Sequence, residues 1–163
     1  MCDGLPSASN VIVIGENPAT PLKKNWWDYW DATTGFRLNT FVDHYKEERG
    51  RRGKRISNTR MRLDRIRSNS VKCIETNAYQ NEKPDGVGEG VSNFALLSIL
   101  ISHNENLKAI IAHGKIAQEF LDRVIIPDGI KTYSPRHFRM ESYDIIDRIC
   151  AEIKLSVRHT KGT

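Results

Sequence analysis

The sequence predicts an α/β protein, a three-layer α/β/α sandwich with a central, mostly parallel, four-stranded sheet. Short runs of β-branched and other apolar residues, the first at 11–14, alternate along the chain with segments whose apolar residues recur at three- and four-residue spacing. Strands separated by helices imply right-handed crossovers, and therefore a parallel sheet with helices on both faces. With 163 residues, 39% of them hydrophobic, the chain is long enough for one domain, spanning 1–163, with its own core.

The first half of the chain predicts one strand and two helices around a long loop. In order, the elements are a strand at 10–14, a loop at 16–37, a helix at 38–48, the glycine-containing loop RGRRGKR and a helix at 59–67. The strand is mostly β-branched and ends at Gly15. Either Ser57 or Asn58 can cap the second helix.

The second half repeats the alternation of strand and helix. In order, we expect a strand at 71–76, a polar loop, a helix at 93–102, a strand at 107–112, a helix at 115–124, a strand near 129–133 and a helix at 143–155. Ser92 can cap the helix at 93–102, which is apolar on most sides and is therefore predicted to be largely buried.

The basic residues are concentrated in one segment. Residues 46–67 contain ten Lys and Arg against three acids, while the rest of the chain is slightly acidic, so the net charge of +5 originates here. Such a segment is typical of a protein that contacts phosphate. The alternative is a solvated helix face followed by a mobile loop. The candidate DNA contacts are Arg51, Arg52, Lys54, Arg55 and Arg60, with Arg136 in a later loop.

Other features of the sequence suggest a cytoplasmic protein. We find no secretory signal at the start of the sequence and no apolar stretch of about 18 residues that could cross a membrane. The three cysteines, Cys2, Cys73 and Cys150, are scattered, which favours a reducing compartment and argues against a disulfide framework or a cysteine metal site.

Polar segments follow all four predicted strands, and in a parallel sheet the strand ends meet at one edge. Asn17 precedes Pro18, which restricts its backbone, and its amide suits the holding of a water molecule. Glu16 is a candidate general base beside it. Asn77 could read the hydrogen-bonding edge of a base. The alternative for each asparagine is a residue that only ends a strand.

Histidines and aromatic residues supply the remaining candidates. His113 and His137 follow the third and fourth strands, and either could donate a hydrogen bond to an anion. We favour His137, because His113 lies in a tight turn beside Gly114 and has the more structural setting. Phe36 is the first candidate for stacking on a base and Tyr79 the second.

These motifs together resemble the uracil-DNA glycosylase superfamily. The resemblance depends on a strand running into Gly-x-Asn-Pro, a second strand running into Asn, and a late loop with Ser-Pro and a nearby His. The segments GENPATPLKKNWWDYWDATTGF, SNTRMR, ETNAY and AHGKIA are similar to uncharacterised bacterial members. In the family the late motif reads His-Pro-Ser, whereas here Thr132 stands before Ser134-Pro135 and His137 follows them.

The resemblance implies a role for each candidate residue. Asn17 would position the attacking water with Glu16 assisting, Asn77 would read uracil, Phe36 would stack on it, Ser134 would bind substrate and His137 would stabilise the departing base. Phe138 or Met140 would insert into the base stack. The resemblance implies DNA as the partner, single- or double-stranded, without a metal, an organic cofactor or an obligate protein partner.

Three functions fit the sequence. The first is hydrolysis of the N-glycosidic bond of uracil or a related deaminated base in DNA, with the basic segment following the phosphate backbone. The second is nucleic-acid binding by a non-catalytic member of the same fold, which the altered late motif favours. The third is hydrolysis of free nucleosides or nucleotides, for which the basic segment would be unnecessary; a glycine-rich phosphate loop after a strand is absent from the sequence.

Overall fold

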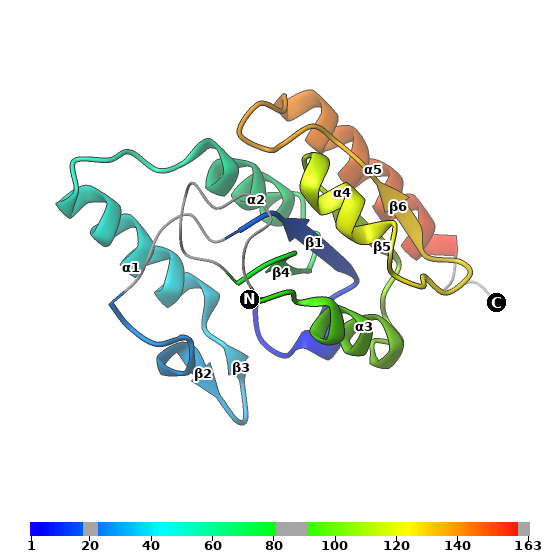
Figure 1. Ribbon diagram of the computed structural model, residues 1–163, viewed down its shortest axis with the longest axis horizontal. Helices are drawn as coiled ribbons and strands as arrows, with labels where there is room; N and C mark the ends of the chain where they lie inside the picture. Colours follow the sequence, from blue (N-terminus) through cyan, green and yellow to red (C-terminus); the bar gives the residue numbers. More distant parts are fainter. Residues whose placement is uncertain (18–22, 81–90, 160–163) are drawn as a thin grey trace.

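The computed structural model describes residues 1–17, 23–80 and 91–159, and it confirms the predicted α/β architecture (Figure 1). The main sheet has four strands in the order β4-β1-β5-β6, and every neighbouring pair is parallel. The strands are β1 (Val11–Gly15), β4 (Cys73–Asn77), β5 (Ala109–Ala112) and β6 (Lys131–Tyr133). Because β1 lies between β4 and β5, its carboxyl end is flanked on both sides by other strand ends.

Helices cover both faces of the sheet, and the side chains of β1 alternate between the two layers. Val11 and Val13 pack in one cluster with residues of α2 (Asn58–Ser68) and α5 (Tyr143–His159). Ile12 and Ile14 pack in the other with residues of α1 (Leu38–Arg51), α3 (Phe94–His103) and α4 (Lys115–Leu121). This alternation follows from the two-residue period of a strand, and it produces the expected three layers.

Two segments predicted as loops contain regular structure. Helix α1 extends through Gly50 to Arg51, where Arg51 lies close to Glu47 and Glu48 one turn earlier and supports the last turn. The loop at 16–37 contains the short helix η2 (Trp26–Tyr29) and an antiparallel pair formed by β2 (Trp30–Asp31) and β3 (Gly35–Phe36). A further short helix, η1, spans Pro6–Ala8. Residues 50 and 51 are therefore helical, while residues 54–57 have no regular structure.

The prediction that the helix at 93–102 is largely buried is wrong. Leu97 and Ile101 are buried on the sheet, but Phe94, Leu96 and Ile99 are 41% to 57% exposed. Only one face of the helix packs on the core, with Leu100 partly buried beside Leu97 and Ile101, so Phe94, Leu96 and Ile99 remain accessible. Among the described residues, we find no helix that is both long and apolar enough to span a bilayer.

Candidate active site at the carboxyl ends of the strands

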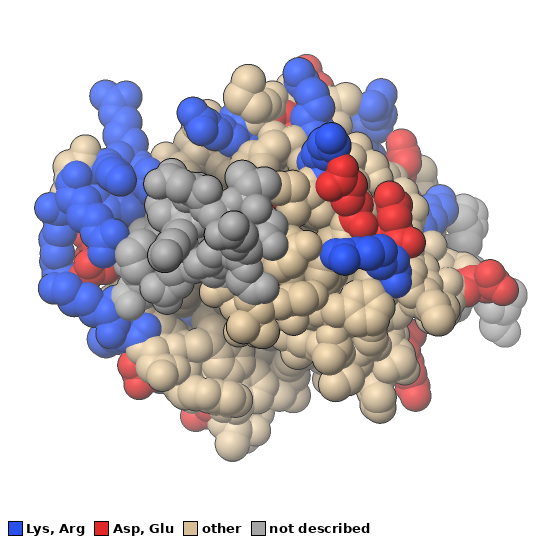
Figure 2. Space-filling model, in the orientation of Figure 1, with Lys and Arg blue, Asp and Glu red and all other residues tan. Residues whose placement is uncertain are grey.

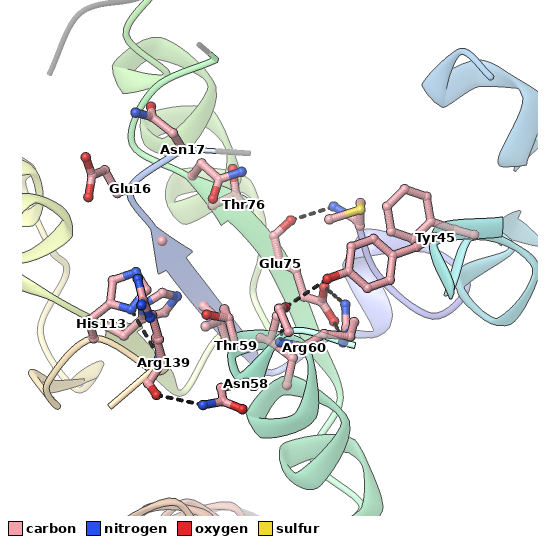
Figure 3. A pocket seen from close by; sticks show the side chains of 18 of the residues that line it. Glu16, Asn17, Tyr45, Asn58, Thr59, Arg60, Glu75, Thr76, His113 and Arg139 are labelled. Carbon is pink, nitrogen blue, oxygen red and sulfur yellow. Dashed lines mark hydrogen bonds and ion pairs between the residues drawn. The ribbon is translucent and has the colours of Figure 1, made fainter. Parts of the chain in front are cut away.

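A cavity of about 650 Å³ opens at the carboxyl ends of β1 and β4 (Figure 3). Its floor is formed by the end of β1 with Glu16 and Asn17, by Glu75, Thr76 and Asn77 of β4, and by His113, which follows β5. Its walls come from one face of α1, from the first turns of α2 and from the loop after β6. The predicted convergence of strand ends on one edge of the sheet is therefore observed.

Gly15 is the point of closest approach in this cavity. It is paired in register with Asn77, and His113 follows β5 on its other side. A Cβ atom at position 15 would lie 2.9 Å from Oδ1 of Asn77 and 3.0 Å from Nε2 of His113. The first contact is shorter than a Cβ atom tolerates and the second is tight, so a side chain at position 15 would push Asn77 and His113 from their positions.

His113 is buried and uncharged. Burial, together with the charge of nearby His137, lowers the pKa of His113 to about 3. Its ring stacks on Phe138, and the backbone N–H of Phe138 donates to its Nδ1 at 3.4 Å. A neutral imidazole that accepts at Nδ1 carries its proton on Nε2. His113 therefore offers a hydrogen-bond donor to the space beside Gly15.

His137 lies next to His113, with the two rings perpendicular and their centroids 5.0 Å apart. The backbone N–H of Arg139 donates to its Nδ1 at 3.1 Å. Burial lowers the pKa of His137, the carboxylate of Glu16 opposes this shift, and Arg139 adds to it. The sequence alone favoured His137 over His113, whereas in the structure both line the cavity and His113 is the more buried of the two.

Glu16 and Asn17 extend from the end of β1 in different directions. Figure 3 shows Asn17 on the side of Thr76, and Glu16 on the side of His113. Both side chains are partly buried and line the cavity. The turn is held to β4 by two backbone hydrogen bonds, from Ala78 to Gly15 and from Tyr79 to Glu16. The candidate base and the candidate water-holding amide thus have fixed positions at one strand end.

Arg60 was predicted as a DNA contact, but it lines the cavity as a buried, paired cation and does not belong to the exposed basic surface. Its guanidinium donates to both carboxylate oxygens of Glu75, at 2.6 and 2.7 Å, and the two side chains are only 5% and 3% exposed. Asp64 accepts a further bond at 3.0 Å. Burial opposes the charge on Arg60, but hydrogen bonding to Glu75 and the charges of Glu75 and Asp64 raise its pKa overall. The count of basic residues in the sequence included Arg60 among the exposed cations. In the structure it lies with Leu63 on the face of α2 that is turned toward the cavity.

Phe36 does not line the cavity, so its predicted stacking role is wrong for this structure. It is 1% exposed, and its ring packs between Trp26 and Phe41 with centroid distances of 5.0 and 5.8 Å. The aromatic side chains of the cavity are instead Phe41 and Tyr45, which lie one turn apart on α1. Their four-residue spacing places both rings on the face of α1 that lines the cavity.

Other predicted residues lie outside the cavity. The ring of Tyr79 packs against Phe120, and its hydroxyl accepts a bond from Arg123 at 3.3 Å. Ser134 is exposed and does not line the cavity. Arg136 is also exposed, and its guanidinium lies 3.4 Å from Glu141. The structure thus brings Glu16, Asn17, Asn77 and His137 together, but leaves Tyr79, Ser134 and Arg136 elsewhere.

Phe138, the first candidate for insertion into the base stack, is not available for that role, because its side chain is fully buried against His113. Met140, the alternative, is exposed.

Four exposed cations form a group that we call the basic cluster: Arg51, Arg52, Lys54 and Arg55. Figure 2 shows Lys and Arg side chains gathered at this end of the molecule. Arg49 connects the cluster to the cavity, because it lines the cavity and its Nε donates to the backbone oxygen of Arg55 at 2.6 Å. Four residues that were not predicted as site residues also line the cavity: Arg49, Asn58, Thr59 and Arg139. Of these, Asn58 is fixed by a bond to the backbone oxygen of Arg139 at 3.3 Å.

The fold and the cavity define a class: an α/β protein with amide, carboxylate and imidazole groups at the carboxyl ends of parallel strands. Within the described ranges, no group of three His, Cys, Asp or Glu side chains is placed to hold a metal ion. Comparisons of the chain with protein-family models, curated protein sequences and solved structures give no match.

Proposed function

We propose that the protein is a DNA glycosylase that hydrolyses the N-glycosidic bond of uracil or a related deaminated base. The observation that carries the proposal is the meeting of Asn77 and His113 beside Gly15, in a cavity that Arg49 links to the basic cluster. A volume of about 650 Å³ is suitable for a nucleobase with its sugar. The motif resemblance to the uracil-DNA glycosylase superfamily supports the same function.

Each part of the proposed reaction has a candidate group. Water adds to C1′ of the sugar while the C1′–N bond breaks, and the base leaves with the bonding electron pair. The amide of Asn17 would orient the water, and Glu16 would accept its proton. The sugar gains positive charge and the base gains negative charge in the transition state, so a donor aimed at a base oxygen lowers the barrier by about 3 kcal/mol.

His113 is the better candidate for that donor. Its neutral state follows from its burial, and the bond from Phe138 to Nδ1 directs its Nε2 proton toward the cavity. The amide of Asn77 offers both a donor and an acceptor, which match the carbonyl and N–H on one edge of uracil. His137 and Glu16 would set the electrostatic environment of His113. The ring of His137 lies against that of His113, and the carboxylate of Glu16 favours the charged form of His137.

DNA would approach from the side of the basic cluster. Exposed arginine and lysine side chains supply affinity for phosphate that does not depend on sequence, and the target nucleotide would rotate out of the helix to enter the cavity. The cysteines are buried thiols, and burial raises the pKa of Cys73 to about 12 and that of Cys150 to about 11. Reduced thiols and a DNA substrate favour a cytoplasmic location.

The test is the formation of abasic sites in a labelled oligonucleotide that carries one uracil, offered as a single strand and as a duplex. We expect cleavage by the wild type and a loss of about 100-fold or more in Asn17→Ala and His113→Gln. His103→Gln is the matched control, because His103 is exposed near the end of α3 and does not line the cavity.

Binding without cleavage, across uracil, hypoxanthine and mismatched bases, would contradict the catalytic proposal and favour a non-catalytic nucleic-acid-binding protein. Equal cleavage of free deoxyuridine and of uracil in DNA would favour a nucleoside hydrolase.

A further inference from the structure

The chain presents a pair of tryptophans to solvent at the end of α1 opposite the basic cluster. Trp27 is 68% exposed and Trp26 is 38% exposed. Lys23 and Lys24 precede them and are exposed as well. We call Trp26, Trp27 and these two lysines the tryptophan surface. A tryptophan side chain with so large an exposed fraction is uncommon on a protein surface. The proposed catalytic groups do not account for it.

Trp27 is held in a fixed position. Asn25 caps η2, with its side-chain oxygen accepting from the backbone N–H of Trp27 at 3.1 Å. The carboxylate of Asp28 completes the cap by accepting from the backbone N–H of Asn25 at 2.9 Å. The Trp27 ring packs edge-on against Trp26, and Trp26 stacks on Trp30 with centroids 5.5 Å apart. The indole is therefore positioned before any ligand arrives, which lowers the entropy cost of binding.

The tryptophan surface is linked to the cavity wall by rings that pack in the interior. Trp26 stacks on Phe36, Phe36 packs on Phe41, and Phe41 lines the cavity. Helix α1 then runs along the cavity from Phe41 through Tyr45 to Arg49, next to the basic cluster. Figure 1 shows the β2–β3 pair near the first residues of α1 and the connection to α2 at its far end.

The spacing of these parts suits a short strand of nucleic acid. Helix α1 has 14 residues and is about 21 Å long at 1.5 Å per residue. At the duplex rise of about 3.4 Å per nucleotide this length corresponds to roughly six nucleotides, and an extended single strand spans it with fewer. One strand could therefore contact the basic cluster with its phosphates, place one base in the cavity and reach the tryptophans with another.

We propose that the tryptophan surface stacks an unpaired base of a bound nucleic-acid strand. Base–aromatic stacking is independent of sequence, because every base has a flat face, but it requires that face to be uncovered. Bases inside a duplex are covered by their neighbours, so the surface favours single-stranded or locally opened DNA. This inference rests on the proposed function only in taking DNA as the ligand; it does not require catalysis.

Intrinsic fluorescence gives a direct test, since the three tryptophans of the chain are Trp26, Trp27 and Trp30. The probe is a 12-nucleotide oligodeoxythymidylate, which contains no uracil. We expect it to quench the tryptophan emission, and a hairpin-capped duplex to bind with much less quenching. A trinucleotide should bind more weakly, because it is too short to join the basic cluster to Trp27.

Substitutions at Trp27 test the contact itself by anisotropy of the labelled 12-mer. Trp27→Leu should weaken binding about tenfold or more, whereas Trp27→Tyr, which keeps an aromatic ring, should retain most of the affinity. Ile125→Ala is the matched control, because Ile125 is a 92% exposed apolar residue outside the tryptophan surface and the cavity, and we expect no change.

Absence of quenching, or equal affinity of Trp27→Leu and the wild type, would overturn this inference. The two proposals can fail separately. Uracil excision combined with unchanged binding by Trp27→Leu would refute only the stacking role. Quenching and a Trp27-dependent affinity without abasic product would support the stacking role and refute the glycosylase.

Discussion

Replacing Arg60 with Met would show how strongly the wall of the cavity depends on one buried charge pair. The substitution removes the guanidinium that binds both carboxylate oxygens of Glu75. It leaves that carboxylate buried, since the side chains of Arg60 and Glu75 are 5% and 3% exposed. Breaking a buried pair by removing one partner costs about 3–5 kcal/mol, because the remaining charge loses both water and its counterion. For a protein of this size the loss corresponds to a decrease in Tm of about 10 °C.

Arg65 provides a matched control on the same helix. Its guanidinium also makes a two-point contact with a carboxylate, Asp147, at 2.8 and 2.7 Å. These side chains are 47% and 35% exposed, so water replaces much of the broken interaction. An exposed pair contributes about 0–1 kcal/mol, and Arg65→Met should therefore destabilise the protein much less than Arg60→Met.

Urea denaturation followed by circular dichroism measures the free energy of unfolding of both variants. The double variant Arg60→Met with Glu75→Leu should recover part of the loss, because it removes the uncompensated carboxylate. If Arg60→Met is no more destabilising than Arg65→Met, the reasoning from burial is wrong. A loss of DNA affinity in Arg60→Met without a loss of stability would restore Arg60 as a candidate DNA contact.

Three further predictions concern the cavity and the basic cluster. Gly15→Ala should fold but lose about 100-fold in abasic-site formation, because its Cβ would displace Asn77 and His113; circular dichroism and the excision assay separate these effects. His113 has a pKa lowered from 6.5 to about 3, so below pH 6.5 the unfolded chain binds a proton that the folded chain does not. Its contribution to stability is complete above pH 6.5 and falls on acidification, and urea denaturation should show the wild type losing about 2 kcal/mol more than His113→Phe between pH 7 and pH 5. Lys54→Gln combined with Arg55→Gln should reduce the slope of log affinity against log salt by about one for each phosphate that these side chains neutralise in the wild type, as measured by anisotropy.

The sequence predicted the order of the main elements because each carries its own periodicity. The strand at 11–15 is buried on both faces and reads as a continuous apolar run, as expected in a parallel sheet. The C-terminal turn of α1 was missed because Gly50 and the basic run indicated a loop, whereas pairing with Glu47 and Glu48 supports a helix. The burial of α3 was overestimated because composition does not say which part of an apolar helix has a partner.

The sequence predicted which strand ends converge, but not the positions of side chains whose environment depends on tertiary packing. Asn17 follows β1 and Asn77 is the last residue of the parallel strand β4, so topology alone brings them to one edge of the sheet. Phe36 and Arg60 were chosen for the chemistry of their side chains, but both lie in the interior. The sequence contains no local signal for this outcome, because the ring contacts of Phe36 and the carboxylate that binds Arg60 come from other elements.

The reversal in the order of the two histidines has a physical basis that links stability to the proposed chemistry. A neutral imidazole can donate a hydrogen bond to the departing base without placing a positive charge beside the sugar, which itself becomes positive in the transition state. Burial keeps His113 neutral and thereby favours the donor form at neutral pH, while the same burial makes the fold less stable in acid. A tight strand-end turn suggests a structural role, but it also removes water from the ring and directs Nε2 toward Gly15. Substitutions at position 113 should therefore remove both the excision activity and the part of the destabilisation in acid that comes from this histidine. A variant that removes only one of the two would show that they have different causes.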